Sequence, residues 1–218
     1  MRLSKRLKAI SGLIDKDSIV LDIGCDHAYL SIDLINSHKS TKVYAIDNKE
    51  APLLEAKKNI KDFNLESKII PILSDGLMNV NVHDYTHIVM AGLGGELIAN
   101  ILKRDTIKDD VTLILEPNIN AYAVREALVS LSYSIINEVM VLDSNVYYPI
   151  IVARKESILP NYSFTELNFG PILIKTKSKE LKGYLERKIS ILESKNTANN
   201  IALTNKINFY KEALNEIK

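Results

Sequence analysis

The stretch YSIINEVMVL-DSN-VYYPIIVA, residues 133–153, decides the fold of this chain of 218 residues. Two apolar runs, residues 133–142 and 146–153, are joined by only the three residues at 143–145. Three residues cannot carry a chain across the face of a sheet, so the two runs are predicted to pair as an antiparallel hairpin.

Upstream of the hairpin, short β-branched runs alternate with stretches of helical periodicity, which is typical of buried parallel strands covered by helices. A nicotinamide-type Rossmann domain uses right-handed parallel crossovers throughout, so the hairpin argues against it. A parallel sheet closed by an antiparallel last strand is instead the pattern of class I methyltransferases. The sequence therefore predicts an α/β fold with a Rossmann-like, seven-stranded sheet. Its other strands are expected at residues 18–23, 42–46, 68–73, 86–91 and 111–116, with helices at 28–37, 50–62, 94–104 and 119–131.

The strand pattern stops after Lys155. Residues 157–171 contain two prolines and a glycine and are predicted to form a loop. We therefore expect two domains, an α/β domain over residues 1–155 and a helical, coiled-coil-like tail over residues 156–218.

Two segments of the tail, residues 178–195 and 198–217, carry apolar stripes at heptad spacing, which indicates an antiparallel helical hairpin with its turn near residues 196–200. The stripes are Leu181, Leu185, Ile189 and Leu192 in the first segment, and Leu203, Ile207, Tyr210, Leu214 and Ile217 in the second.

Composition places the chain among ordinary globular proteins, with 46% apolar and 25% charged residues. No apolar run approaches the roughly 20 residues that span a bilayer, and no signal peptide is recognised, so no membrane association is expected. The single cysteine excludes an internal disulfide, and no Cys/His cluster has metal-ligand spacing, so no metal is expected. These features favour a cytoplasmic protein, which we expect to be a monomer.

The net charge of +1 is unevenly distributed. Residues 1–154 hold 17 Lys and Arg against 20 Asp and Glu, net −3, and residues 155–218 hold 11 against 7, net +4. The first eight residues form the start of a basic, amphipathic helix and include four cations. Two basic ends could grip a polyanion, and an ordinary solvated surface explains the same charges.

The string VLDIGCDHA, residues 20–28, ends the first strand and opens the first helix of the sheet. Gly24 allows a tight turn and a close approach of the backbone to a ligand. Asp26 and Ala28 replace the second and third glycines of the dinucleotide pattern. A carboxylate is electrostatically wrong beside a pyrophosphate and suits a cationic sulfonium. A turn without a ligand is the other interpretation.

Acidic residues also follow the next two strands. Asp47 lies 23 residues after Gly24, where an acidic residue commonly binds ribose hydroxyls, and it can equally cap the following helix. Asp75-Gly76 follows the third strand, at the position that contacts the adenine of the cofactor in class I methyltransferases. A simple turn is the other interpretation. The carboxyl ends of parallel strands meet in one crevice, so these groups are predicted to converge. After the fourth strand, AGLGGE at 91–96 permits the close approach of a flat substrate, and a glycine-rich turn at the start of a helix is the other interpretation.

These motifs resemble those of bacterial tRNA (adenine-22-N1)-methyltransferases, over essentially the whole chain. The resemblance implies S-adenosylmethionine as cofactor, tRNA as substrate and methylation of adenine N1, by a Rossmann-like domain followed by a helical one. Cys25 stands where serine is usual, Glu116 where glutamine is expected, and the tail is short for the family. The motifs are LSKRL (3–7), DIGCDHAYL (22–30), DGL (75–77), AGLGG (91–95), PNI (117–119), RE (125–126) and FGP (169–171).

The resemblance also implies roles for particular residues. Asp26 is the expected catalytic carboxylate, which would stabilise the positive charge that develops on the adenine ring. For Tyr29, helix packing competes with base stacking, and for Arg6 a solvated position competes with RNA contact. For His27, a position at the start of a helix near the ligand competes with a contact to the substrate. The cofactor is expected to lie against Gly24, Cys25, Asp47, Asn48, Asp75, Gly76, Ala91 and Gly92. The substrate is expected to lie against Arg6, His27, Tyr29 and Asn118.

Two other functions stay open at this point. A methyltransferase acting on a small molecule or a protein would not bind tRNA. A non-catalytic RNA-binding protein of the same fold would not bind S-adenosylmethionine.

Overall fold

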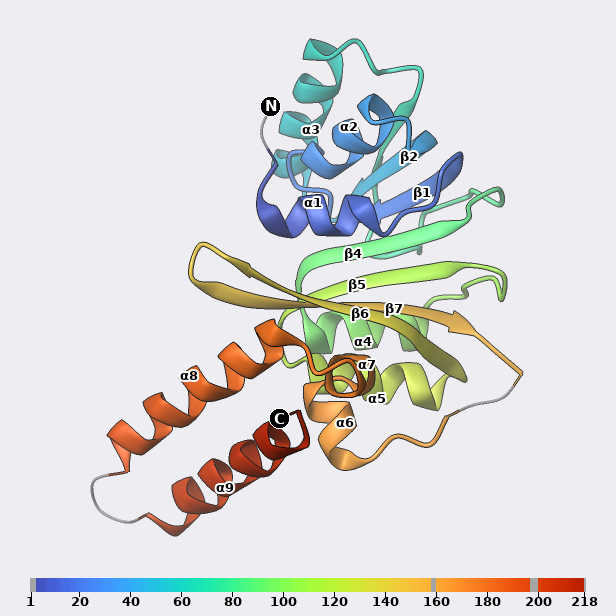
Figure 1. Cartoon of the computed structure of the whole chain (residues 1–218). Helices are drawn as coiled ribbons and strands as arrows, with labels where there is room; N and C mark the ends of the chain where they lie inside the picture. Colours follow the sequence, from blue (N-terminus) through green and yellow to red (C-terminus); the bar gives the residue numbers. More distant parts are fainter. Residues whose placement is uncertain (1–2, 158–159, 197–199, 218) are drawn as a thin grey trace.

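The computed structural model describes residues 3–157, 160–196 and 200–217, which form a seven-stranded sheet flanked by helices and a pair of helices that projects away from it (Figure 1). The strands are β1 (Ser18–Ile23), β2 (Ser40–Asp47), β3 (Ile69–Leu73), β4 (His87–Gly94), β5 (Thr112–Ile119), β6 (Tyr133–Asp143) and β7 (Val146–Lys155). The helices are α1 (Lys5–Gly12), α2 (Tyr29–Asn36), α3 (Glu50–Asp62), α4 (Gly95–Arg104), α5 (Ala121–Ser130), α6 (Phe164–Phe169), α7 (Pro171–Lys175), α8 (Lys179–Lys195) and α9 (Ile201–Glu216).

The strand order is β3-β2-β1-β4-β5-β7-β6. Strands β1 to β5 are parallel, whereas β7 pairs antiparallel with both β5 and β6. The predicted methyltransferase-type sheet and its terminal hairpin are therefore confirmed. The order of the strands changes direction between the parallel neighbours β1 and β4, and at such a point a sheet of this kind opens a crevice at the carboxyl ends of its strands.

Two apolar layers enclose the sheet. Helices α1, α2 and α3 pack on one face through side chains such as Ile10, Ile32 and Leu53. Helices α4 and α5 pack on the other face through side chains such as Ile98 and Val124. The strands are apolar on both sides because both faces are covered, as their unbroken apolar runs predict.

The predicted loop over residues 157–171 is wrong in its second half, because α6 lies inside it and α7 begins at Pro171. Ser163 and Glu166 form a reciprocal capping box that starts α6, and Pro171 occupies the first turn of α7, where a missing N–H has no cost. These helices have only six and five residues, too few to show a helical period. The predicted helical hairpin is present as α8 and α9; most of its expected turn lies outside the described residues.

A buried ion pair ties α6 and α7 to the sheet domain. Arg125 on α5 donates through Nε to Glu138 Oε1 on β6 (2.8 Å) and through Nη1 to the carbonyl of Leu167 (3.0 Å). The other carboxylate oxygen of Glu138 accepts the backbone N–H of Ile172 (2.9 Å). These hydrogen bonds dock the segment that follows β7 against α5 and β6. Because both side chains are buried, loss of either one would leave the other as an uncompensated buried charge.

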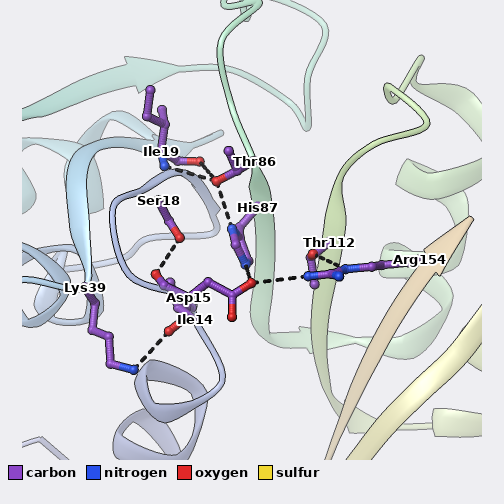
Figure 2. Close-up of polar contacts among 9 residues, drawn as sticks. All are labelled: Ile14, Asp15, Ser18, Ile19, Lys39, Thr86, His87, Thr112 and Arg154. Atoms are coloured by element: carbon purple, nitrogen blue, oxygen red, sulfur yellow. Dashed lines mark hydrogen bonds and ion pairs between the residues drawn. The ribbon is translucent and has the colours of Figure 1, made fainter.

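A second polar network lies at the amino ends of β1, β4 and β5 (Figure 2). His87 is buried, with Nδ1 2.9 Å from the Thr86 hydroxyl and Nε2 3.5 Å from the carboxylate of Asp15. The same carboxylate lies 3.2 Å from Nη2 of Arg154, whose Nε donates to the Thr112 hydroxyl. Burial lowers the pKa of His87, against the opposing effect of Asp15. The network joins the α1–β1 loop to β4, β5 and β7.

Candidate active site

A cavity of about 460 Å³ opens at the carboxyl ends of β1, β2, β3, β4 and β5. The structure brings all the sequence-predicted site residues to its wall, from segments that span more than half of the chain. They are Arg6, Gly24, Cys25, Asp26, His27, Tyr29, Asp47, Asn48, Asp75, Gly76, Ala91, Gly92 and Asn118.

The β1–α2 loop bends sharply around the cavity. Gly24 (φ +77°), Asp26 (φ +49°) and Ala28 (φ +58°) all have left-handed backbone conformations. The N–H groups of Gly24 and Cys25 both donate to the Ile46 carbonyl (2.8 and 3.0 Å), which fixes the loop on β2. A side chain at Gly24 would be strained and would press on Leu93. Three residues of this short loop thus have a left-handed backbone, which is unfavourable for Asp26 and Ala28. Backbone strain of this kind is concentrated at functional sites and is uncommon in a simple turn.

Asp47 supports this loop from the end of β2. Its Oδ2 accepts the N–H of Asp26 (3.2 Å), and its Oδ1 accepts the N–H of Lys49 (3.0 Å). The carboxylate is thus held in place at the cavity wall by two backbone donors. The alternative of a helix cap is met only in part, because Lys49, not Asp47, is the residue that precedes α3.

Asp22 lies beneath the loop and was not predicted as a site residue. Burial, partly offset by a hydrogen bond from the Ser31 hydroxyl (2.6 Å), raises the pKa of Asp22 to about 6, and the charge of Asp47 adds to the rise. Burial and the nearby carboxylates also raise the pKa of the Cys25 thiol. Cys25 is therefore a neutral wall residue and not a nucleophile.

Asp75 and Gly76 form the wall beyond β3. Arg104 donates to the Asp75 carboxylate (2.9 Å) and carbonyl (2.9 Å), and its Nε donates to Asp105 (2.7 Å). A Cβ at Gly76 (φ +59°) would collide with the Asp105 side chain. The arginine holds Asp75 in one orientation at the edge of the cavity, where a carboxylate can accept an amine hydrogen.

The wall opposite is built on Glu116, which is fully buried. Its Oε2 accepts hydrogen bonds from Nη1 of Arg6 (2.5 Å) and from the N–H of Gly92 (3.0 Å), whereas Oε1 has no hydrogen-bond partner among the described residues. Burial raises the pKa of Glu116, and Arg6 and the Gly92 amide oppose the rise. Arg6 also lies over the ring of Tyr148, 5.2 Å from its centroid. This pairing joins the start of the chain to the ends of β4 and β5, and only the unexpected carboxylate at 116 hinted at it.

The mouth of the cavity carries polar and aromatic side chains. The Asp26 side chain is 69% exposed, and its Oδ2 lies 3.6 Å from Nε2 of His27. The rings of His27 and Tyr29 stack at 5.5 Å, and Tyr29 is exposed instead of packed into the helix layer. Asn118 donates to the Gly92 carbonyl (2.6 Å) and so braces the glycine segment at the same rim.

In the described ranges, no helix is both long and apolar enough to cross a membrane, and no group of three or more His, Cys, Asp or Glu side chains is placed to hold a metal ion.

Comparisons with known proteins agree with this geometry. Residues 3–151 match the family described as methyltransferase domain. The tRNA (adenine(22)-N(1))-methyltransferase of Bacillus subtilis is 34% identical over 82% of this chain and 77% of its own length. M. capricolum TrmK in complex with S-adenosyl-homocysteine has a TM-score of 0.87 and 30% identity over 100% of both chains. Streptococcus pneumoniae Sp1610 in complex with S-adenosyl-L-methionine has a TM-score of 0.88 and 30% identity over 98% of this chain and 100% of its own.

The sheet, its terminal hairpin and the cavity at its carboxyl end thus define a Rossmann-like methyltransferase that uses S-adenosylmethionine. More narrowly, the chain belongs to the family of bacterial tRNA (adenine(22)-N(1))-methyltransferases.

The cavity suits S-adenosylmethionine in its chemistry. Gly92 (φ +77°) leaves space that a Cβ would fill, at 3.2 Å from the Arg6 guanidinium. The carboxylates of Asp26 and Asp47 are compatible with a sulfonium and with ribose hydroxyls, and they disfavour a pyrophosphate.

Proposed function

We propose that this enzyme transfers the methyl group of S-adenosylmethionine to N1 of adenine 22 in tRNA. The observation that carries the proposal is the convergence of the loop after β1, Asp47, Asp75 and the glycine segment after β4 on one cavity, in a chain of the tRNA (adenine(22)-N(1))-methyltransferase family. The proposal extends to the roles of single residues.

On the cofactor side, Asp47 accepts hydrogen bonds from ribose hydroxyls, and Asp75 with Gly76 lies against the adenine moiety. Gly24, Cys25, Asn48, Ala91 and Gly92 complete this wall. The bound cofactor supplies an electrophilic methyl group on a sulfonium. The orientation of the Asp47 carboxylate by two backbone N–H groups supports this role.

On the substrate side, Asp26 is the proposed catalytic residue. Neutral adenine carries a lone pair on N1, so the reaction needs positioning and charge stabilisation and no strong base. The exposed Asp26 carboxylate accepts a hydrogen from the exocyclic amine and stabilises the positive charge on the methylated ring. His27, Tyr29 and Asn118 contact the target nucleotide at the rim, and Arg6, held by Glu116, faces the same space.

Primer extension on unmodified tRNA tests the proposal. After incubation with the enzyme and S-adenosylmethionine, reverse transcription is expected to stop at adenine 22, because N1-methylation blocks base pairing. A tRNA with guanosine at position 22 and a reaction without cofactor are the controls. Full extension on the unmodified tRNA, despite measured cofactor binding, would refute the proposal and favour a different methyl acceptor.

The tail belongs to the proposal as an RNA-binding element. Residues 155–218 are net +4, whereas residues 1–154 are net −3 and repel a phosphate backbone. A truncation at residue 155 would uncover the ion pair of Arg125 and Glu138, so the cut belongs after residue 177, which retains α6 and α7. The shortened protein is expected to bind cofactor normally and tRNA weakly, with a smaller salt dependence. We place the reaction in the cytoplasm, where its substrate matures, and expect a monomer.

A further inference from the structure

A second cleft, of about 620 Å³, adjoins the candidate active site. Its walls are the β5–α5 turn, the β6–β7 hairpin and the tail helices α8 and α9, which run side by side away from the sheet (Figure 1). Among the described residues that line the two cavities, Asn118 is common to both. The cleft therefore begins where the rim of the active site ends.

The charge of the cleft is positive. Its described lining includes four cations, Arg125, Arg187, Lys188 and Lys206, and no Asp or Glu. Arg125 is neutralised by the buried Glu138 and faces no ligand as a free charge. Arg187 donates to the Asn145 carbonyl in the β6–β7 turn (2.6 Å), which fixes α8 against the hairpin. Lys188 and Lys206 are exposed at the edge. A cationic edge whose described lining holds no acidic side chain is complementary to phosphate.

The walls also gather exposed apolar side chains from three separate elements. Ile119 in β5 is 72% exposed, Val146 in β7 is 46% exposed, and Ile191 in α8 is 39% exposed. Tyr147 lies beside them in edge contact with Tyr184 of α8 (5.9 Å between ring centroids). Large apolar side chains facing solvent in one concavity indicate a ligand with flat apolar faces.

These observations together point to an unpaired nucleotide of RNA. Stacking on apolar and aromatic side chains combined with cations on the backbone is how proteins hold single-stranded nucleic acid. An enzyme that reacts with a base edge must take that base out of the stack, which separates it from its neighbours. A neighbour of the displaced base then needs a binding surface within one nucleotide of the active site.

We propose that this cleft binds a nucleotide that flanks the target adenine, with its phosphate at Lys188, Lys206 and Arg187 and its base against Ile119, Val146 and Ile191. The cleft therefore does more than add general positive charge, because it fixes the register in which the RNA enters the active site. This inference rests on the proposed function, since it takes tRNA as the substrate.

Matched charge-reversal variants test the phosphate half of the proposal. K188E/K206E changes two exposed lysines that line the cleft, and K179E/K182E changes two exposed lysines on α8 that do not line it. The change in net charge is the same. With unmodified tRNA as the probe, K188E/K206E is expected to weaken binding by about tenfold or more and to lower the salt slope by about 0.7, the value for the one phosphate that the two lysines contact together. K179E/K182E is expected to change both much less. Calorimetric affinity for S-adenosylmethionine is expected to stay the same in both.

The variant I119S tests the base half, because Ile119 is exposed and its replacement leaves the core unchanged. We expect weaker tRNA binding and a lower single-turnover rate, with an unchanged unfolding temperature. Equal losses in the two charge variants would mean diffuse attraction only and would overturn the inference. So would unchanged tRNA binding in K188E/K206E, or an unchanged I119S. Methylation of tRNA by the wild-type enzyme is measured first. If the wild-type enzyme does not methylate tRNA, the proposed function itself fails, and the variants are then not compared.

Discussion

The two ends of the parallel sheet put polar side chains to different uses. At the amino end, a chain of polar contacts joins the loop before β1 to the neighbouring strands (Figure 2). It runs from Thr86 through His87 and Asp15 to Arg154. At the carboxyl end, polar groups border a cavity of about 460 Å³, and the Asp26 carboxylate points into solvent.

The difference teaches how to distinguish structural from functional polar residues in this fold. The amino-end groups mostly contact one another within the protein, so these contacts contribute to the free energy of folding. Nε2 of His87 has no hydrogen bond among the described residues and lies 3.5 Å from the Asp15 carboxylate. At the carboxyl end, the Asp26 carboxylate is exposed at the mouth of the cavity, and Oε1 of the buried Glu116 has no hydrogen-bond partner in the part of the chain that the structure describes. Substitutions at the carboxyl end should therefore change activity more than stability, and those at the amino end the reverse.

The largest expected effect is at Asp26. Asp26→Ala and Asp26→Asn are both expected to reduce single-turnover methylation by about 10²–10³-fold, the scale for removing one electrostatic contact to a transition state. The unfolding temperature and cofactor affinity should change little, because the side chain is 69% exposed.

Asp26→Asn is the sharper variant of the two. Residue 26 has φ +49°, a conformation that asparagine tolerates better than alanine, so this variant preserves the loop and removes only the charge. Near-wild-type methylation by Asp26→Asn would show that the carboxylate is not needed and would remove the catalytic assignment.

Much of this end of the sheet could be predicted from the sequence. Gly24, Asp47 and Asp75 each follow an apolar run, and the topology of a parallel sheet brings the ends of such runs together. The hairpin at 133–153 could be predicted because a three-residue connection permits one strand arrangement.

The rest depends on contacts that no local pattern encodes. Arg6 and Glu116 are 110 residues apart, and their pairing requires the packed fold. The burial of Asp22 depends on the loop above it. Helices α6 and α7 are too short to show periodicity, and the ion pair that holds them, Arg125 with Glu138, joins elements that the sequence only places in order.

The next effect in size is at Asp47. Asp47→Ala is expected to weaken S-adenosylmethionine binding by about 1–3 kcal/mol, because ribose hydroxyls lose a charged acceptor. The loop N–H of Asp26 loses its acceptor as well. Asp47→Asn, which keeps an oxygen there, should lose less. Calorimetric titration measures both, and an unchanged dissociation constant in Asp47→Ala would place the ribose elsewhere.

At the amino end, Thr86→Val should have the reverse profile. The Thr86 hydroxyl accepts the N–H of Ile19 (3.1 Å) and lies 2.9 Å from Nδ1 of His87. We expect a loss of about 0.5–1.5 kcal/mol in the free energy of unfolding, measured in urea, with normal cofactor binding and methylation. Thr86→Ser, which keeps the hydroxyl, is the control. A loss of activity at constant stability would break the distinction between the two ends.

The smallest expected effect is the pH dependence contributed by His87. Its pKa is lowered in the folded protein from 6.5, first because burial disfavours the charged ring, while Asp15 opposes and Arg154 adds to the lowering. Below pH 6.5 the unfolded chain therefore binds a proton that the folded protein does not, and the contribution of His87 to stability falls as the pH falls through its folded-state pKa.

Asp22 and Glu116, whose pKa values are raised, act in the opposite direction at acidic pH, so the wild-type profile alone is ambiguous. Both carboxyls remain in His87→Gln, and their contributions cancel in the difference between the two proteins. Urea unfolding of both at pH 8, 6 and 5 should show that the stability of the wild type, relative to His87→Gln, decreases with each step toward acid. A difference that stays constant with pH would mean that His87 keeps its ordinary pKa in the fold, and the amino end of the sheet would then be less closed than its contacts imply.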